Sequence, residues 1–489
     1  MKLRTLVLAV MAISASGCMI GPDYLRPDID SPQAYRFEPQ QAAATADSQW
    51  WKQYADPVLD QLIADALANN LDVKVAAANV QAAAGILTST RAPIFPQFGY
   101  SADAGRARYS ESGDGAIAPG TVNPQSFNQA AVTASWEIDL WGRIRRQTEA
   151  SEASLLATEQ ARRGVILSLV SGVASGYLSI VATVANSYLQ LRGLDQQLEV
   201  ARKTQQAYAE SLKYFELQFQ YGQTSEMNVA QARSQYETAS AQIPLIEQQI
   251  VELENALSLL AGRNPGPIPR GKSLEQLGAP AVPAGLPSEL LERRPDIMQA
   301  EQQLIAANAR IGAAKALYFP SISLTGNFGG SSSELSDVFN GSAKTWNYTG
   351  SFIGPIFTAG LISGQVAQAE ANQQAALFNY QQVIQAAFGD VSNALSSREK
   401  LLLQVQSQQR QVVALRDFVR LARLQYDGGY APYSTVLLAE LQLFPAELTL
   451  AQTTANNAAA LATIYKAMGG GWIERAAGMT EAGVAATAN

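Results

Sequence analysis

Two short segments in the second half of the chain alternate between apolar and polar residues. A period of two predicts β-strands with one apolar and one polar face. We expect these strands at about residues 320–330 and 345–357. The polar positions are Ser, Thr and Asn, which suit a wet interior better than a dry core. The apolar positions predicted to face outward are Ile322, Leu324, Phe328, Trp346, Tyr348 and Phe352.

A weaker form of this pattern occurs in the first half, at about residues 96–108 and 127–140, where Trp136 takes an outward position. A small soluble β domain would explain a single hairpin of this kind. Four strands cannot close a barrel, however, because the smallest known barrels have about eight. Three copies of the chain would supply about twelve strands, so the pattern predicts a trimer.

Elsewhere, apolar residues recur every three or four positions, which is the spacing of helices that pack side by side. The pattern predicts two very long helices, at about 143–220 and 361–427. At about 1.5 Å per residue they would measure about 117 Å and about 100 Å. Shorter partner helices are expected at about 226–261 and 433–467, with kinks at Pro244 and Pro445.

The two halves of the chain resemble each other in sequence. Residues 70–96 align with residues 294–320 at a constant offset, and the later elements follow in the same order. This predicts one duplicated unit. The predicted domains are a signal segment at 1–17, an N-terminal equatorial segment at 18–70, a first repeat at 71–261, a Pro-rich equatorial linker at 262–293, a second repeat at 294–468 and an equatorial tail at 469–489.

Two glycine-containing turns join the helices at the end that lies away from the strands. Glycine permits a left-handed backbone in such a turn. In a trimer six of these turns would meet, and they could close or open the end of a tube. Their residues are Tyr221, Gly222, Gln223, Thr224 and Ser225 in the first turn, and Tyr426, Asp427, Gly428, Gly429, Tyr430 and Tyr433 around the second.

Composition removes many kinds of chemistry. The chain contains no histidine and a single cysteine, Cys18, which excludes Ser-His-Asp and Cys-His catalysis, His-ligated metal sites and intrachain disulfides. The net charge of −7 argues against a nucleic-acid partner, because binding phosphate requires a basic surface. The carboxylates Glu137 and Asp139 share a strand face and are interpreted as lumen or rim charges. We expect no catalytic residue, no metal site and no cofactor.

The amino terminus has the order of an export signal. Lys2 and Arg4 precede an apolar run, Leu6 to Ile13, which is too short to span a bilayer. Small residues follow and lead directly to Cys18. This order resembles the lipobox of bacterial lipoproteins and implies that Cys18 is lipidated. The alternative is a plain signal peptide with an incidental cysteine.

Two further stretches imitate known signals. Residues 164–191 carry no charge and are long enough for a transmembrane helix, but a stripe of Ser, Thr and Gln at helical spacing favours one packed and one wet face. Gly266 to Ser273 matches the nucleotide-binding loop pattern, yet Pro267 and Pro269 delete backbone donors that this loop needs. We interpret this segment as a solvent-exposed linker.

Several motifs together resemble the outer membrane efflux protein family of the TolC type, in its NodT-like lipoprotein branch. They cover nearly the whole mature chain. The motifs are Cys18-Met-Ile-Gly-Pro-Asp-Tyr24, Trp50-Trp51, Leu286 to Asp296, Ile311 to Pro320 and Gly469-Gly-Gly-Trp472.

The resemblance implies a homotrimer that is mainly α-helical with a small β part. A twelve-stranded barrel would cross the outer membrane and continue into a long periplasmic helical barrel with a mixed equatorial belt. The channel would be a passive duct for an inner-membrane pump of the RND type and a periplasmic adaptor. The adaptor would dock at the turns 221–225 and 426–433, which would also gate the tunnel. Ala431 stands where family members often carry an acidic residue, and Asp427 lies one helical turn earlier.

Two other functions fit the residues less well. A lipid-anchored periplasmic coiled-coil scaffold without a pore would not need outward aromatic residues such as Trp346 and Tyr348. A lipoprotein hydrolase would be unusual without histidine. The exported substrate is not specified by the sequence.

Overall fold

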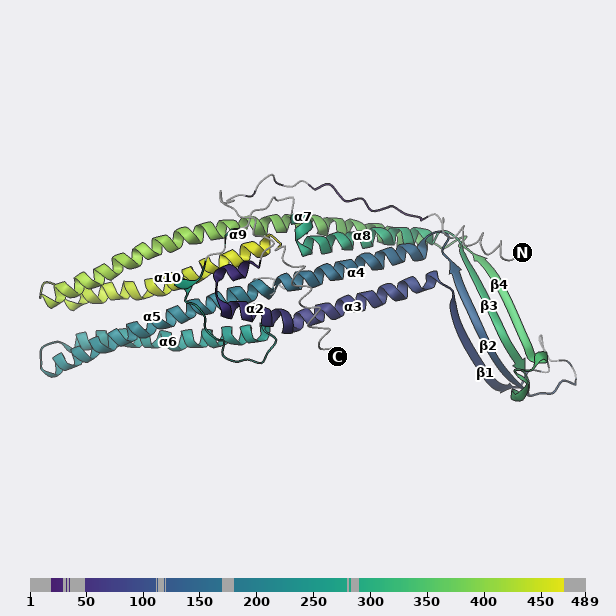
Figure 1. Cartoon of the computed structure of the whole chain (residues 1–489), viewed down its shortest axis with the longest axis horizontal. Coiled ribbons are helices and arrows are strands. Elements are labelled where there is room, and N and C mark those ends of the chain that lie inside the picture. Colours follow the sequence, from purple (N-terminus) through teal and green to yellow (C-terminus); the bar gives the residue numbers. More distant parts are fainter. Residues whose placement is uncertain are drawn as a thin grey trace. The chain divides into compact units, whose positions relative to one another are not determined.

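The structure is a computed structural model, shown in Figure 1. Cys18 and the residues after Gly469 lie outside the part that it describes. The chain forms two compact units, and each unit takes segments from both sequence repeats. Unit 1 comprises Met1–Asp28, Gln81–Ala157 and Ala300–Tyr380, and unit 2 comprises Ile29–Val80, Thr158–Gln299 and Gln381–Asn489. The described residues are 19–29, 32, 35, 49–110, 112, 118, 120–168, 180–278, 281–282 and 290–469, with only the backbone described at 161–168 and 180.

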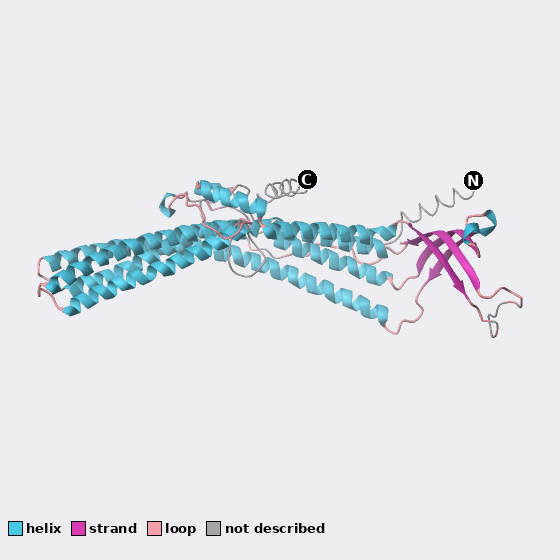
Figure 2. Ribbon diagram, turned by 90° about the horizontal axis from the view of Figure 1, so that it is seen from below, coloured by secondary structure: helices cyan, strands magenta, loops and turns pink. Residues whose placement is uncertain are grey.

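Unit 1 contains a four-stranded antiparallel sheet with the strand order β1-β2-β3-β4, drawn in magenta in Figure 2. The two repeats meet where β2 pairs with β3. The last strand ends earlier than expected, since Gly354 and Pro355 follow it and proline has no N–H group for a strand ladder. The strands are β1 (Gln97–Ala107), β2 (Gln125–Ile138), β3 (Ser321–Ser332) and β4 (Lys344–Ile353).

Helices make up most of the described chain. The long helix expected at 361–427 is continuous, whereas residues 169–179 of the other expected long helix lie outside the described part. Pro244 and Pro445 lie inside helices that continue on both sides of them. The main helices are α2 (Pro57–Asn69), α3 (Leu71–Arg91), α4 (Arg143–Ser168), α5 (Ile180–Gln220), α6 (Glu226–Leu260), α7 (Leu290–Arg293), α8 (Pro295–Ala316), α9 (Leu361–Asp427) and α10 (Tyr433–Ala467).

No helix in the described ranges has an apolar stretch long enough to cross a membrane.

The element order shows the duplication directly. In the first half α3 is followed by β1, β2, α4, α5 and α6, and in the second half α8 is followed by β3, β4, α9 and α10. Asp72 and Asp296, which align in sequence, both lie in the first turn of their helix. Pro96 and Pro320 each stand immediately before the first strand of their repeat.

A large hydrophobic core lies in unit 2, where α2, α5, α6 and α10 pack together. Apolar residues of α5 at the expected three- and four-residue spacing, including Val184 and Leu191, are buried there. The short helix η1 (Trp50–Tyr54) adds aromatic contacts. Trp50 stacks on Tyr465 with ring centroids 4.9 Å apart. This core holds the segment before α2 against the carboxyl end of α10.

Candidate functional site

One face of the sheet presents large apolar side chains to the surroundings. Side chains alternate along a strand, so the register decides which residues share a face. Phe328 lies opposite Val132 and Trp346, and these positions are exposed by 56%, 54% and 66%. Tyr348 is exposed by 79%. By this register all of the predicted outward residues share one face: Trp136, Ile322, Leu324, Phe328, Trp346, Tyr348 and Phe352.

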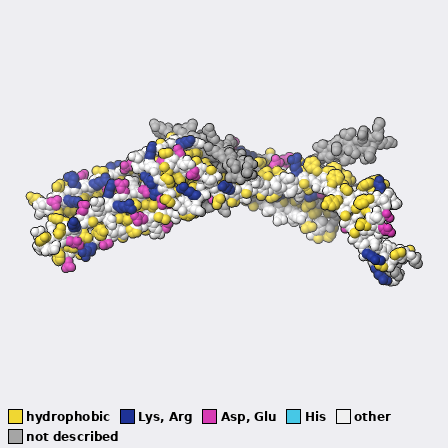
Figure 3. Space-filling view, turned by 60° about the horizontal axis from the view of Figure 1, so that its bottom comes forward, with side chains coloured by type: hydrophobic (Ala, Val, Ile, Leu, Met, Phe, Trp, Pro, Cys, Tyr) yellow, Lys and Arg dark blue, Asp and Glu magenta, His cyan; other side chains and the backbone are white. Residues whose placement is uncertain are grey.

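The opposite face of the same sheet is polar. Asn327 lies opposite Thr133 and Asn347, and Ser323 lies opposite Glu137. Hydroxyl and amide groups of this kind can hydrogen-bond to water without binding one solute tightly. Figure 3 shows hydrophobic side chains in yellow at the surface of the part that holds the sheet, whereas charged side chains are scattered over the part that holds α5 and α6. The sheet therefore has the two chemically different faces that the alternation predicted.

The carboxylates at the end of β2 form ion pairs with the first turn of α4. Glu137 lies 2.8 Å from Nη2 of Arg143. Asp139 accepts hydrogen bonds from the backbone N–H groups of Ile144, at 3.1 Å, and Arg145, at 2.8 Å. Asp139 thereby satisfies donors that the start of a helix leaves without partners. The two residues have a structural role at the strand–helix junction that their interpretation as lumen or rim charges did not include.

The residues that follow Cys18 form a strap, defined as Met19–Arg26, along α4 and α8 of unit 1. Arg146 of α4 is only 2% exposed and donates to the carbonyl oxygens of Ile20 and Gly21 at 3.2 and 3.3 Å. Its Nη2 also lies 2.8 Å from Asp23. The backbone N–H of Ile20 donates to the carbonyl of Trp141 at 3.2 Å. The strap is thus held by a buried arginine beside the start of α4.

The far end of the strap is held by a second ion pair. Arg26 lies 3.0 Å from Glu301 of α8, and the Tyr24 hydroxyl donates to the same carboxylate at 3.2 Å. Burial, together with the charge of Glu301, raises the pKa of Tyr24, so its hydroxyl remains protonated and available as a donor. In the motif Cys18 to Tyr24, which carried only a resemblance in the sequence, the contacts of Gly21, Asp23 and Tyr24 with α4 and α8 give these residues a structural role.

The two turns predicted as functional tips both lie in unit 2 and have the same construction. Gly222 and Gly429 adopt φ values of 69° and 73°, which a residue with a side chain rarely takes. The N–H of Gln223 donates to the carbonyl of Gln218 at 2.8 Å, and the N–H of Tyr430 donates to that of Gln425 at 2.8 Å. These bonds satisfy carbonyl groups at the ends of α5 and α9.

Aromatic residues from three helices pack together next to these turns. Phe215 of α5 is 1% exposed, and its ring centroid lies 4.2 Å from that of Tyr433. Tyr433 also contacts Tyr426, with ring centroids 5.4 Å apart. Tyr221 and Tyr430 are exposed by 75% and 90%. Of the predicted tip residues, Tyr426 and Tyr433 therefore hold the helix ends together, while Tyr221 and Tyr430 present surface.

An ion pair that the sequence interpretation missed joins α9 to α10 near the aromatic cluster. Arg423 donates to Oε1 of Glu440 from both Nε, at 3.2 Å, and Nη2, at 2.6 Å. The Glu440 side chain is 5% exposed and the Arg423 side chain 50%. The sequence feature that could have revealed this ion pair is the acidic Glu440 within the apolar stripe that contains Tyr433 and Phe444. Asp427, expected to act near this tip, is exposed at the end of α9.

A pocket of about 180 Å³ lies beside this ion pair. It is lined by residues of α5, α9 and α10, including Tyr208, Arg423 and Glu440. The Tyr208 hydroxyl donates to the backbone carbonyl of Glu440 at 3.4 Å, which links α5 to α10. Burial, followed by the charge of Glu440, raises the pKa of Tyr433 to about 12, so this tyrosine is neutral at physiological pH.

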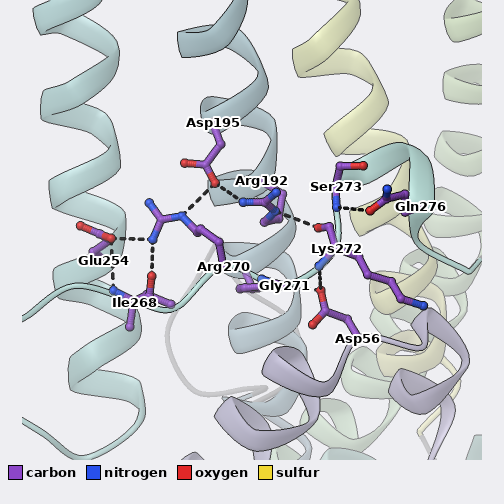
Figure 4. Close-up of polar contacts among 11 residues, drawn as sticks. Asp56, Arg192, Asp195, Glu254, Ile268, Arg270, Gly271, Lys272, Ser273 and Gln276 are labelled. Carbon is purple, nitrogen blue, oxygen red and sulfur yellow. Dashed lines mark hydrogen bonds and ion pairs between the residues drawn. The ribbon is translucent and has the colours of Figure 1, made fainter.

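The segment that matches the nucleotide-binding loop pattern exposes Pro267 and Pro269 but buries Ile268 against helices of unit 2, so its interpretation as a solvent-exposed linker was only partly right. Arg270 forms ion pairs with Asp195 of α5, at 2.9 Å, and Glu254 of α6, at 2.6 Å. Figure 4 shows these contacts and the carboxylate of Asp56 directed at the backbone of Lys272. The sequence did not reveal these partners, because they lie far away along the chain.

The Asp56 carboxylate accepts hydrogen bonds from three separate segments of the chain. It caps α2 by accepting the N–H of Val58 at 2.9 Å, and it accepts the N–H of Lys272 at 2.9 Å and the hydroxyl of Tyr188 at 3.0 Å. The N–H of Gly271 donates to the Tyr188 oxygen at 2.8 Å. The N–H groups of Gly271 and Lys272 are therefore already bound within the chain, which argues against a nucleotide there.

Replacing Asp56 with alanine should lower the free energy of unfolding of unit 2 by about 2–4 kcal/mol. The helix cap contributes about 1 kcal/mol, and buried donors left without an acceptor cost about 1–3 kcal/mol. Thermal unfolding followed by circular dichroism measures the effect. Asp65→Ala in the same helix is the control, since its bond to Gln61 is exposed. Equal stability of the two variants would contradict this role of Asp56.

In the ranges that the structure describes, no group of three or more His, Cys, Asp or Glu side chains could hold a metal ion. The features that remain for function are the two-faced sheet, the strap and the helix tips.

The matches to known proteins agree with this geometry. A sequence profile of the outer membrane efflux protein family matches residues 62–263 and 286–470. The chain belongs to the outer membrane efflux protein family. It is 35% identical over 468 residues to the cation efflux system protein CusC of Escherichia coli O6:H1, covering 94% of this chain and 97% of CusC. It is 34% identical over 479 residues to the probable outer membrane lipoprotein SilC of Salmonella typhimurium, covering 97% and 100% of the two chains.

Solved structures of the family have the same fold. A crystal structure of CusC matches with a TM-score of 0.80 at 34% identity, over 93% of this chain and 100% of that one. The CmeC outer membrane channel of Campylobacter jejuni matches with a TM-score of 0.84 at 26% identity, over 93% and 95%. These likenesses confirm the predicted fold class, a mainly helical channel fold of the TolC type with a small β part.

As an outer membrane efflux protein, the chain is located in the outer membrane and extends into the periplasm. The members of this family are transport channels rather than enzymes. Membership of the family also agrees with the two sheet faces, since a membrane strand that borders water needs one apolar and one polar side.

Proposed function

We propose that three copies of this chain form the outer-membrane duct of a tripartite efflux system, through which small molecules leave the cell passively. The observation that carries this proposal is the four-stranded sheet with one apolar and one polar face. Within the described residues, β1 and β4 are the edges of this sheet. Open edges expose backbone groups that hydrocarbon cannot satisfy, so a membrane-embedded sheet must close. Three sheets supply about twelve strands, enough for a closed barrel.

The same sheet supports a water-filled duct. Its polar face would line the lumen with groups such as Asn327, Asn347 and Thr133. The helices would continue the duct into the periplasm. A passive duct of this kind supplies no energy itself, so export requires an energy source outside this protein. We assign that role to an inner-membrane pump of the RND type, reached through a periplasmic adaptor.

The helix tips are the proposed docking site for the adaptor. Tyr221 and Tyr430 are highly exposed aromatic residues on turns whose backbones are fixed by hydrogen bonds within the helix ends. Tyrosine offers a large apolar ring and a polar hydroxyl, which suits it to protein interfaces. The proposed site comprises Tyr221, Gly222, Gln223, Thr224 and Ser225 in one turn, and Tyr426, Asp427, Gly428, Gly429, Tyr430 and Tyr433 around the other.

We also propose that Cys18 is lipidated and anchors the mature chain. The relative SilC is named an outer membrane lipoprotein. The strap supports the same role, because Ile20 is bound beside the strand–helix junction and Cys18 precedes it by only two residues. A single acyl chain holds a protein to a membrane weakly, so the anchor would act together with the barrel.

The mass and the conductance of the detergent-extracted protein test the proposed duct. Light scattering, corrected for bound detergent, should give the mass of three chains. Planar bilayers should show steady single-channel conductance, because the lumen is water-filled. A monomer would leave the sheet open and would overturn the proposal. The turns 221–225 and 426–433 could close the tunnel, so conductance is also measured after their removal. A trimer that still shows no conductance would contradict the duct while leaving the oligomer intact.

A further inference from the structure

A pocket on the apolar face of the sheet stands apart from the functions described so far. It has a volume of about 520 Å³ and includes Tyr100, Val132, Phe328, Val338, Phe339 and Lys344 in its lining. Small-molecule sites commonly span about 300–1,000 Å³, so this is a pocket of ligand size. It lies towards the loop end of the strands, opposite the end where β2, β3 and β4 connect to helices.

The loop between β3 and β4 forms one wall of this pocket. We define the overhang as residues 335–343. It folds back over the sheet at Gly330, where an added Cβ atom would overlap the carbonyl oxygen of Val338. Val338 is 3% exposed, whereas the neighbouring Phe339 is 86% exposed. Because Gly330 lies opposite Lys344 and Ala130 in the register, the overhang covers the apolar face rather than the polar one.

A cation stands at the rim of this apolar pocket. Nζ of Lys344 lies 5.0 Å from the ring centroid of Phe328. Among the residues that the structure describes, Lys344 takes part in no ion pair. The acid of the overhang, Asp337, accepts a hydrogen bond from Asn340 at 2.7 Å and forms no ion pair with Lys344. The pocket therefore combines apolar walls with one ammonium group that is available to an anion.

The position of Lys344 along the strand matches the edge of a membrane. β4 runs from Lys344 to Ile353, and Phe352 marks the other end of its apolar face. Eight steps of about 3.4 Å, tilted by about 40°, give a height of about 21 Å. The apolar band of an outer-membrane barrel is about 25 Å tall. An ammonium at this level would meet the head groups of the leaflet on the loop side.

We propose that this pocket binds one acyl chain of a membrane lipid whose phosphate head group pairs with Lys344. The proposal rests on the proposed function, since the apolar face must lie in a membrane. Because the pocket is continuous with that face, an acyl chain could enter it from the membrane. The positive charge of Lys344 would select a lipid with an anionic head group. The overhang and the sheet would enclose the chain on two sides. Each copy of the protein would hold one such lipid.

Native mass spectrometry of the detergent-extracted trimer tests this site. The probes are dimyristoyl phosphatidic acid and dimyristoylglycerol, which share their acyl chains and differ in the phosphate. The wild type should bind the phosphatidic acid about tenfold more tightly, because a charge-assisted contact is added. Lys344→Ala should abolish this difference. Inorganic phosphate should not bind, since it lacks the acyl chain.

Two further variants separate the parts of the site. Ala130→Leu fills the pocket without changing charge, and it should weaken the binding of both lipids. Lys400→Ala, an exposed lysine on α9, should behave as the wild type. A preference for phosphatidic acid that survives Lys344→Ala would overturn the proposal, as would unchanged binding in Ala130→Leu. Trimer mass and conductance are measured on the same sample. Failure of those two measurements would instead overturn the proposed function.

Discussion

Replacing Tyr348 with arginine is expected to abolish assembly of the protein in the outer membrane. Tyr348 lies midway along the apolar face of β4 and is 79% exposed within the single chain. An arginine at the middle of the lipid-facing surface of a barrel costs about 2–4 kcal/mol. Three copies in one barrel bring the cost to about 6–12 kcal/mol, which is comparable with the whole stability of a typical protein.

The neighbouring residue provides a matched control for this prediction. Asn347 lies opposite Asn327 on the polar face, so Asn347→Arg introduces the same charge towards the water-filled side. Both variants are compared by membrane fractionation and by the fraction of heat-resistant trimer on denaturing gels. Tyr348→Arg should be lost from the outer membrane, and Asn347→Arg should assemble. Equal assembly of both, or equal loss of both, would refute the assignment of the two faces.

This pair of variants also distinguishes the duct from a lipid-anchored scaffold. A periplasmic scaffold would keep its sheet in water, where an exposed arginine has little energetic cost. Tyr348→Arg would then be tolerated as well as Asn347→Arg. Trp346 and Tyr348 have stacked rings with centroids 5.9 Å apart. In a scaffold they would form an exposed apolar patch with no partner. Such patches are rare on soluble monomers unless they serve an interaction.

The elements were predictable because their signals are local. The alternation of Trp346, Tyr348 and Phe352 with polar residues identifies both the strand and its apolar face. The bounds of α9 coincide with the expected range because a glycine pair ends the helix and no proline interrupts it. Periodicity and turn chemistry are properties of neighbouring residues, so a single sequence contains them.

The polar contacts were not predictable because their partners are distant in sequence. Nothing near Arg146 indicates that it binds the carbonyl groups of Ile20 and Gly21. The same holds for Asp56, which accepts a hydrogen bond from the N–H of Lys272, 216 residues later in the sequence. For the linker, composition indicated the exposure of Pro267 and Pro269 but not the packing of Ile268 between them. Such contacts follow from the tertiary fold and not from local pattern.

Removing Arg423 is expected to loosen the tip of the α9–α10 pair. Arg423→Ala leaves the carboxylate of Glu440, 5% exposed, without its cation. A buried charge that loses its partner costs about 3–5 kcal/mol, and we expect about 3 kcal/mol because the Arg423 side is half exposed. Hydrogen exchange measures this directly in the segment around Tyr433. A loss of about 3 kcal/mol corresponds to about 100-fold faster exchange of amides that open with the tip.

Two variants separate the lost charge pair from a general effect of the substitution. Arg420→Ala removes an exposed arginine one turn earlier, whose pair with Asp417 spans 3.2 Å, and exchange should change less than about fivefold. The double variant Arg423→Ala, Glu440→Gln removes the buried charge together with its partner. It should recover most of the protection, because a neutral amide costs far less to bury than a carboxylate. If the double variant exchanges as fast as Arg423→Ala, the buried charge is not what Arg423 stabilises, and the aliphatic packing of the arginine side chain must account for the loss.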